Sequence, residues 1–174
     1  MGNSNKDAIA YHYNISNEFY RLWLDKQMVY SCAYFESEDN SLDQAQCDKL
    51  EYICRKLRLR PGDHLLDIGC GWGALICWAA RHHEVYAHGI TLSREQYSYC
   101  QKRIEQEGLL DRVTVDLMDY HDLPSETLYD KIVSVGMFEH VGLNNLPHYF
   151  AITYRLLKPG GLFLNHGITE TQEG

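Results

Sequence analysis

The sequence predicts a doubly wound α/β fold with a mainly parallel sheet, preceded by an N-terminal helical segment. Two observations support this prediction. From residue 61 onward, apolar runs typical of buried strands alternate with amphipathic stretches typical of helices. A glycine-rich loop also stands between the first of these strands and the next helix. Residues 1–60 lack this alternation, so we expect a helical lid over 1–60 and the α/β core over 61–174, within one compact domain.

Composition excludes several classes of protein. The 174 residues are 45% hydrophobic and 23% charged, which excludes disordered, collagen-like and coiled-coil chains. The net charge of −8 argues against nucleic acid as a partner. Residues 1–7 do not begin a signal peptide and no apolar run suits a membrane helix, so we expect a cytoplasmic protein. The six cysteines form no CxxC pair, which favours reduced thiols and no zinc site.

Two helices are predicted ahead of the core. Ser16 can cap a short helix that runs to Asp25. One face of that helix carries apolar side chains, namely Phe19, Leu22 and Trp23. Residues 41–44 read S-L-D-Q, a capping box that begins a second helix. The apolar residues of this second helix recur at helical spacing: Leu42, Ala45, Leu50, Ile53, Cys54 and Leu57.

Strands and helices then alternate after a turn at Pro61-Gly62. The five strands are expected at residues 64–68, 85–90, 113–117, 131–135 and 162–166. Helices are expected over 74–82, from Ser93 to Gly108, and over 146–157. Ser93 opens its helix with the capping box S-R-E-Q, and Gly108 suits the position just past the helix end. The sequence K-P-G-G at 158–161 predicts a turn.

The strongest local signal is LLDIGCGWG at residues 65–73. Its three glycines let a ligand approach the backbone, and the helix start beyond them offers N–H groups to an anion. A dinucleotide site would need an acid after the second strand, where the sequence reads GITLS. Asp67 instead precedes the first glycine, which suits a ligand with a positive amine. The pattern resembles the S-adenosylmethionine loop of class I methyltransferases; the alternative is a glycine-rich turn without a ligand.

Four further motifs narrow this resemblance. They are YHYNIS at 11–16, YSCAYF at 30–35, TLSREQ at 91–96 and FEHVG at 138–142. Together with GCGWG at 69–73, and in this order, they resemble the cyclopropane fatty acid synthase and mycolic acid cyclopropane synthase family. The similarity runs from about residue 8 to residue 169, which is nearly the whole sequence. It implies a Rossmann-like class I methyltransferase fold.

The resemblance implies a set of residues that bind S-adenosyl-L-methionine. Tyr30 and Ser31 would reach the methionine end of the cofactor, and residues 69–73 would cradle it. Gln96 would bind the ribose hydroxyls, which accounts for the missing acid after the second strand. Met118 stands where some relatives have tryptophan, and with its neighbour it would flank the adenine. The full set is Tyr30, Ser31, Asp67, Gly69, Cys70, Gly71, Trp72, Gly73, Thr91, Gln96, Met118 and Asp119.

The resemblance also implies the reaction. A methyl group passes to the cis double bond of an unsaturated acyl chain, carried by a phospholipid or another carrier. The resulting carbocation needs shielding from water and stabilisation by negative charge or aromatic faces. A base, which in the family is bound bicarbonate, removes a proton from the new methyl group, and the cyclopropane ring closes. The residues that would hold bicarbonate are Tyr13, Cys32, Glu139 and His166, with a further tyrosine later in the family's sequence.

Two of these residues also fit the predicted sheet. Glu139 follows the fourth strand and His166 ends the fifth, and the carboxyl ends of parallel strands face the ligand crevice. Taken singly, Cys32 would be a buried thiol and His166 a hydrogen-bonded structural histidine. Glu139 and His140 are adjacent, so they do not present one chelating face, and no metal is expected.

The family's sheet has more strands than the five predicted here, including a final antiparallel hairpin. We therefore expect a C-terminally truncated chain, with an open apolar edge at residues 162–165 that favours self-association. Water would then reach the cation, so we expect the isolated chain to lack cyclopropanation activity.

Two other functions stay open. A related methyltransferase could quench the cation differently and make methyl-branched or methylene acyl chains. A truncated chain could also bind the cofactor without doing chemistry. For the active enzyme we expect an unsaturated phospholipid or carrier-bound acyl chain as substrate and peripheral contact with the membrane surface. We leave homo-oligomerisation open.

Overall fold

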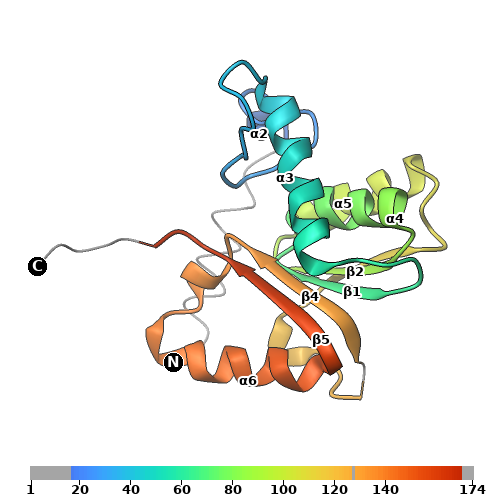
Figure 1. The fold of residues 1–174 in the computed structure, drawn as a ribbon, viewed down its shortest axis with the longest axis vertical. Helices are drawn as coiled ribbons and strands as arrows, with labels where there is room; N and C mark the ends of the chain where they lie inside the picture. Colours follow the sequence, from blue (N-terminus) through green and yellow to red (C-terminus); the bar gives the residue numbers. More distant parts are fainter. Residues whose placement is uncertain (1–16, 127, 170–174) are drawn as a thin grey trace, which may run out of the picture.

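The protein is described by a computed structural model over residues 17–126 and 128–169. Its centre is a five-stranded sheet in the order β3-β2-β1-β4-β5, and every neighbouring pair is parallel (Figure 1). The chain moves outward from β1 to β3 and then returns to the other side of β1, which confirms the doubly wound fold. The strands are β1 (His64–Ile68), β2 (Tyr86–Thr91), β3 (Val113–Leu117), β4 (Tyr129–Val135) and β5 (Leu157–His166).

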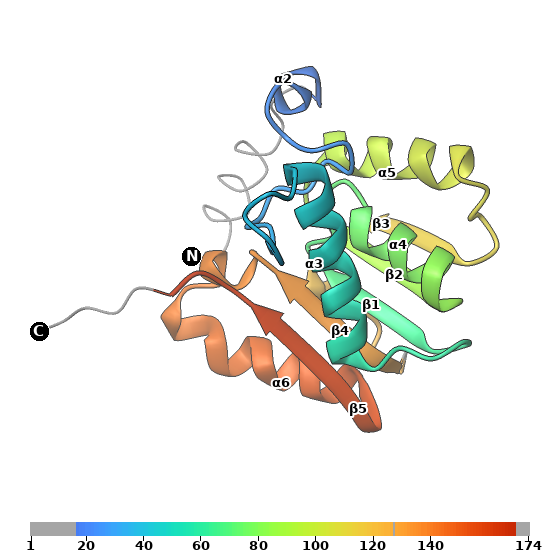
Figure 2. The ribbon, with the colours of Figure 1, turned by 45° about the horizontal axis from the view of Figure 1, so that its top comes forward.

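Helices cover both faces of the sheet (Figure 2). One face carries α3 (Leu42–Leu57), α4 (Ala74–His83) and α5 (Arg94–Gln106), and the other carries α6 (Leu146–Leu156). Successive residues of a strand point to opposite faces, so Leu65 packs into the first core and Leu66 into the second. Three short 3-10 helices complete the fold: η1 (Tyr120–Asp122) follows β3, and η2 (Phe138–His140) and η3 (Leu143–Asn145) lie between β4 and α6.

Both predicted capping boxes begin helices where expected. Ser41 Oγ accepts a hydrogen bond from Gln44 N at 3.2 Å, and Ser93 Oγ accepts one from Gln96 N at 3.3 Å. Gly108, just beyond α5, has φ +68°, as a residue past a helix end often does. Most element bounds agree with the prediction to within a residue or two. In the part of the chain that is described, no helix is long and apolar enough to cross a membrane.

The prediction for the first helix was wrong in length and face. The helix α2 (Asn17–Arg21) ends well before Asp25, and Ser16 lies outside the described residues. Leu22 and Trp23 therefore lie beyond the helix and do not share a helical face with Phe19, and all three side chains are exposed. Tyr20 is the buried residue, with its ring centroid 4.7 Å from that of Trp72. A helix this short presents one inward position, and Tyr20 occupies it. In α3, Leu42 is likewise exposed because it lies in the first turn.

The turn expected at residues 158–161 lies inside β5 rather than before it. Leu157 pairs with Tyr129, and the next pairing joins Leu162 to Lys131. The intervening residues of β5 therefore bulge out of the ladder against a single residue of β4. Gly160 has φ +78°, which suits glycine in such an irregularity. Beyond the bulge, β5 runs at the edge of the described sheet to His166.

Candidate active site

One cavity of about 550 Å³ lies where the carboxyl ends of β1, β2, β3 and β4 meet α3. This is the switch point of the sheet, where doubly wound proteins bind their ligands. All the residues predicted to bind the cofactor line it except Gly73. Four distant stretches of sequence, which the family resemblance singled out, thus converge on one space.

The three loop glycines share a backbone conformation, but the space around Gly71 differs from that around Gly73. All three have positive φ: +85° at Gly69, +56° at Gly71 and +80° at Gly73. A Cβ on Gly71 would meet nothing within 4 Å, so it would project into open space beside the cavity. A Cβ on Gly73 would lie 3.0 Å from Cys100 Sγ. Gly73 does not line the cavity, and a side chain there would crowd Cys100 of α5, so packing alone favours glycine at this position. A role for Gly73 in ligand approach stays a prediction.

Asp67 is a buried acid at the end of β1. It is 3% exposed, and burial raises the pKa of its carboxyl from 3.8 to about 7. None of the residues in the described ranges donates a hydrogen bond to it or forms an ion pair with it. Such a carboxyl gains from a cationic partner, because burial without one favours its neutral form. The geometry is consistent with an amine at this end of the cavity.

Gln96 and Thr91 form a fixed pair on another wall of the cavity. Thr91 Oγ1 donates to Gln96 Oε1 at 2.7 Å and accepts from Ser93 N at 3.2 Å. Both Gln96 and Thr91 are buried. Because the amide oxygen of Gln96 is engaged, its NH2 group is the part that remains to donate to a hydroxyl.

Asp119 caps the 3-10 helix that follows β3. Its Oδ1 accepts from His121 N at 2.9 Å and lies 2.5 Å from His121 Nδ1. These contacts fix the carboxyl beside Met118 on the cavity wall. A polar acceptor next to an apolar thioether suits a flat heteroaromatic group, which fits the predicted adenine position.

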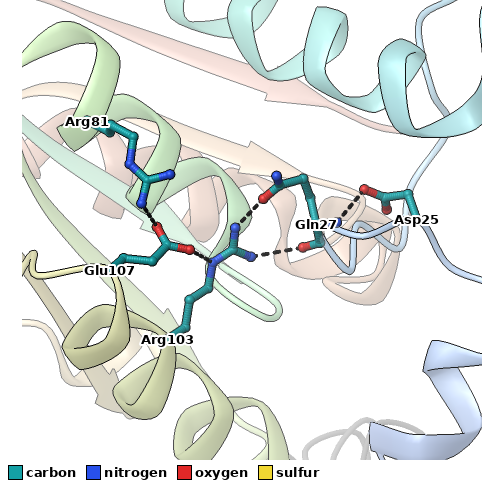
Figure 3. A network of polar contacts seen from close by, with 5 residues as sticks. All are labelled: Asp25, Gln27, Arg81, Arg103 and Glu107. Atoms are coloured by element: carbon teal, nitrogen blue, oxygen red, sulfur yellow. Dashed lines mark hydrogen bonds and ion pairs between the residues drawn. The ribbon is translucent and has the colours of Figure 1, made fainter.

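The segment that carries Tyr30 and Ser31 is held by a polar network rather than by strand pairing (Figure 3). Asp25 accepts from Gln27 N at 2.7 Å and from Val29 N at 2.8 Å, which folds the chain into a tight loop. Arg103 of α5 donates to Gln27 O at 2.9 Å and also bonds the Gln27 side chain. The loop is therefore attached to the helix that begins at the second strand's end.

Arg103 is itself held in place by an acid. Its Nε lies 2.8 Å from Glu107 Oε1, and the other oxygen of Glu107 lies 2.7 Å from Arg81 Nη2. The Arg103 side chain is 11% exposed, whereas that of Arg81 is 49% exposed. Arg103 is thus the inner member of the network and the one that contacts the loop.

Sequence reasoning missed Lys49, a cavity residue on α3. Lys49 is 5% exposed, and its Nζ lies 2.7 Å from Ser31 Oγ. Burial lowers the pKa of the ammonium from 10.5 to about 8. The sequence held a signal, because Lys49 stands four residues after Ala45 and four before Ile53, on the helix's apolar face. A lysine at such a position is unusual, because lysine is rarely buried unless its charge has a partner.

Of the residues predicted to hold the base, the three that the structure describes do not line this cavity: Cys32, Glu139 and His166. Tyr13 lies outside the described residues. Glu139 Oε1 accepts from Ile168 N at 2.6 Å, so Glu139 lies against the chain that follows His166. His166 closes β5, its carbonyl accepts from Gly136 N at 2.9 Å, and its Nδ1 is buried without a hydrogen-bond partner in the described ranges.

Cys32 is an exposed free thiol, contrary to a buried structural role. It follows Ser31, whose Cβ lies 3.8 Å from the position of a Cβ on Gly136. Ser31, the neighbour of Cys32, thus lies beside the end of β4, the strand that leads to Glu139. Within the described ranges, no group of three or more His, Cys, Asp or Glu side chains is placed to hold a metal ion.

Comparison with known proteins gives consistent similarities. The family profile described as "Mycolic acid cyclopropane synthetase" matches residues 2–174. A probable fatty acid methyltransferase of Pseudomonas putida is 55% identical over 163 residues, which are 94% of this chain and 41% of the relative. The cyclopropane-fatty-acyl-phospholipid synthase of Escherichia coli K12 is 50% identical over 157 residues, 90% of this chain and 39% of the relative.

A solved structure is also similar. The crystal structure of mycolic acid cyclopropane synthase CmaA1 complexed with SAH and CTAB superposes with a TM-score of 0.87 at 38% identity. The match covers 91% of this chain and 55% of that one. The chain therefore spans between about two fifths and just over half of the length of these relatives.

Proposed function

The chain belongs to the mycolic acid cyclopropane synthetase family, and from this premise we propose that it takes part in one-carbon transfer from S-adenosyl-L-methionine to the cis double bond of an unsaturated fatty acyl chain. The observation that carries the proposal is the single cavity at the switch point, lined by Asp67, the loop around Gly71, and Gln96. These are the residues that the family motifs single out, and they meet in one place.

The cavity residues fit the cofactor. Gly71 leaves room for a ligand against the backbone, since a Cβ there would meet nothing within 4 Å. Asp67 would hold the ammonium group, Gln96 the ribose hydroxyls, and Asp119 with Met118 the adenine. When bound, the cofactor supplies an electrophilic methyl group on a sulfonium. The protein's part is to orient that group and exclude water from it.

A second group of residues would serve the acyl chain. We propose that Glu139 stabilises positive charge on the chain, and that Cys32, His166 and Tyr13 help to hold a bicarbonate base. The buried Nδ1 of His166, for which the described residues supply no partner, supports an anion at this place. Glu139 lies against Ile168, two residues beyond His166, so both side chains belong to one corner of the fold.

The substrate would reach the protein from a membrane surface. Phe19, Leu22 and Trp23 are exposed on and just after α2, at 47%, 81% and 44%. Apolar side chains of this kind insert into the interfacial region of a bilayer. We therefore propose an unsaturated phospholipid as the acyl carrier and a cytoplasmic protein bound peripherally to the membrane.

A second product class has its own support, because the Pseudomonas putida relative is named a fatty acid methyltransferase. Incubation of the protein with S-adenosylmethionine and vesicles of a monounsaturated phospholipid, followed by mass spectrometry of the acyl esters before and after ozonolysis, which cleaves double bonds, separates the alternatives. A cyclopropane product gains one CH2 and has no double bond. A methylene product has the same mass but keeps a double bond, and a methyl-branched product, which also needs a reductant, carries two further hydrogens. Unchanged lipid, with cofactor still bound, would indicate a cofactor-binding module.

A further inference from the structure

Lys49 is a buried cation that faces the candidate cofactor cavity and has no counterion in the described part of the chain. It lies on α3, among the buried residues Ala45, Leu50 and Ile53. Among the described residues, its Nζ forms hydrogen bonds with Ser31 alone, at 2.7 Å from Oγ and 3.5 Å from the carbonyl oxygen. Burying an ammonium with only neutral partners costs free energy, and the lowered pKa of Lys49 reflects that cost.

The groups around Lys49 do not neutralise it. Asp25 favours the charged form of Lys49, but within the described residues it forms no hydrogen bond or ion pair with the Nζ. Asp25 is engaged by the backbone of its own loop, through Gln27 N and Val29 N. The third N–H of the ammonium is therefore available to a group inside the cavity.

The same cavity also contains a buried acid. Asp67 is a buried acid without a cationic partner, and within the described ranges it does not form an ion pair with Lys49. One cavity thus presents an unpaired buried cation and an unpaired buried anion. A ligand group with both charges, such as the α-amino acid end of a nucleoside thioether or sulfonium, would satisfy the two at once.

We propose that Lys49 binds the carboxylate of the amino-acid end of S-adenosylmethionine, with the Ser31 hydroxyl held beside it for the same carboxylate. The inference rests on the proposed function and adds the element that recognises the ligand's negative end. Gln46 supports this arrangement, because its Nε2 donates to Ser31 O at 3.0 Å and fixes the backbone from which the hydroxyl projects. Lys49 would then discriminate for ligands that carry a carboxylate.

The test pairs a protein change with a ligand change. Titration calorimetry would measure the affinity of wild type and Lys49→Met for S-adenosylhomocysteine and for its decarboxylated analogue, in which a hydrogen atom replaces the carboxylate. For wild type, we expect the loss of the carboxylate to weaken binding roughly 10- to 100-fold, as expected for a charge-assisted hydrogen bond. Lys49→Met should weaken the binding of S-adenosylhomocysteine by a similar factor and leave the binding of the analogue nearly unchanged.

Two results would overturn the inference. If Lys49→Met weakens the binding of both ligands equally, the lysine acts only as a support for Ser31. If wild type binds the two ligands equally, the carboxylate meets no cation, and this result needs no variant, so it stands even where Lys49→Met fails to fold. Lys49→Arg, which keeps the charge, should retain most of the preference for the carboxylate. Failure of wild type to bind S-adenosylhomocysteine at all is a separate outcome, which overturns the proposed function and with it the premise of this inference.

Discussion

The two parts of the candidate site are assembled in different ways. The cofactor part, made of Asp67, residues 69–73, Gln96 and Asp119, surrounds one cavity at the ends of the central strands. The acyl part, made of Cys32, Glu139 and His166, lies outside that cavity, on a loop, a 3-10 helix and the end of the edge strand. The first part lies around the parallel ladder of β1 with its neighbours, whereas the second combines the end of the β4–β5 ladder at His166 with a contact between loops at Glu139. We therefore expect that different substitutions can abolish cofactor binding and turnover separately.

The largest expected effect separates chemistry from binding. In an active form of the enzyme, Glu139→Gln should lower turnover by roughly 10²-fold or more, because a neutral amide stabilises a cation less than a carboxylate does. The amide oxygen can still accept from Ile168 N, so the local structure should persist. Calorimetry should give an unchanged affinity for S-adenosylhomocysteine. A loss of affinity with normal turnover at saturation would mean that Glu139 belongs to the cofactor part.

Asp67→Asn should make the protein more stable and its binding of S-adenosylhomocysteine weaker. The folded-state pKa of Asp67 is about 7, above its ordinary 3.8, so the folded protein holds this proton more tightly. Stability should therefore fall as pH rises from about 4 to 7 in wild type, and the variant should not show this loss. Above pH 7 we expect Asp67→Asn to unfold with a free energy higher by on the order of 2 kcal/mol, and to bind S-adenosylhomocysteine more weakly. Urea unfolding at several pH values measures the first effect; equal pH profiles for the two proteins would contradict it.

Gly71→Val tests whether the cavity side of the glycine loop is the binding surface. Its matched control is Gly108→Val, because Gly108 also has positive φ, at +68° against +56°, and also has open space around a Cβ. Both variants should lose about 1–2 kcal/mol of stability from backbone strain. Only Gly71→Val should weaken the binding of S-adenosylhomocysteine, by about 10-fold or more. Equal affinities for the two variants would remove the loop from the site.

The smallest expected effect concerns the network of Figure 3. Arg103→Met removes both contacts to Gln27, so the loop before Tyr30 becomes less well positioned. We expect the binding of S-adenosylhomocysteine to weaken by about 3-fold. Arg81→Met is the control, since Arg81 contacts Glu107 but not the loop. Calorimetry on both variants gives the comparison. If Arg81→Met lowers the affinity by the same factor, the effect comes from the helix surface and not from the loop.

Much of the fold was predictable because it is encoded locally. The Ser41 and Ser93 caps, the Asp67 strand end and the glycine loop each follow from a few neighbouring residues, and parallel pairing then brings the strand ends together. Lys49 was not predicted, because its position on an apolar helix face gains meaning only when Ser31, 18 residues earlier, folds against it. Tyr20 was missed for the same reason, since its burial depends on Trp72 from the glycine loop. The bulge at 158–161 reads as a turn in sequence because glycine and proline serve both structures.

The most direct test of the two-part site is a crystal structure of the protein with S-adenosylhomocysteine. It should place the ligand in the 550 Å³ cavity, with its amino-acid end between Ser31 and Asp67 and its adenine beside Asp119. Glu139 and His166 should make no contact with it, which would leave them for the acyl chain. A ligand bound elsewhere, or one whose adenine lies against Asp67, would contradict this assignment of the cavity.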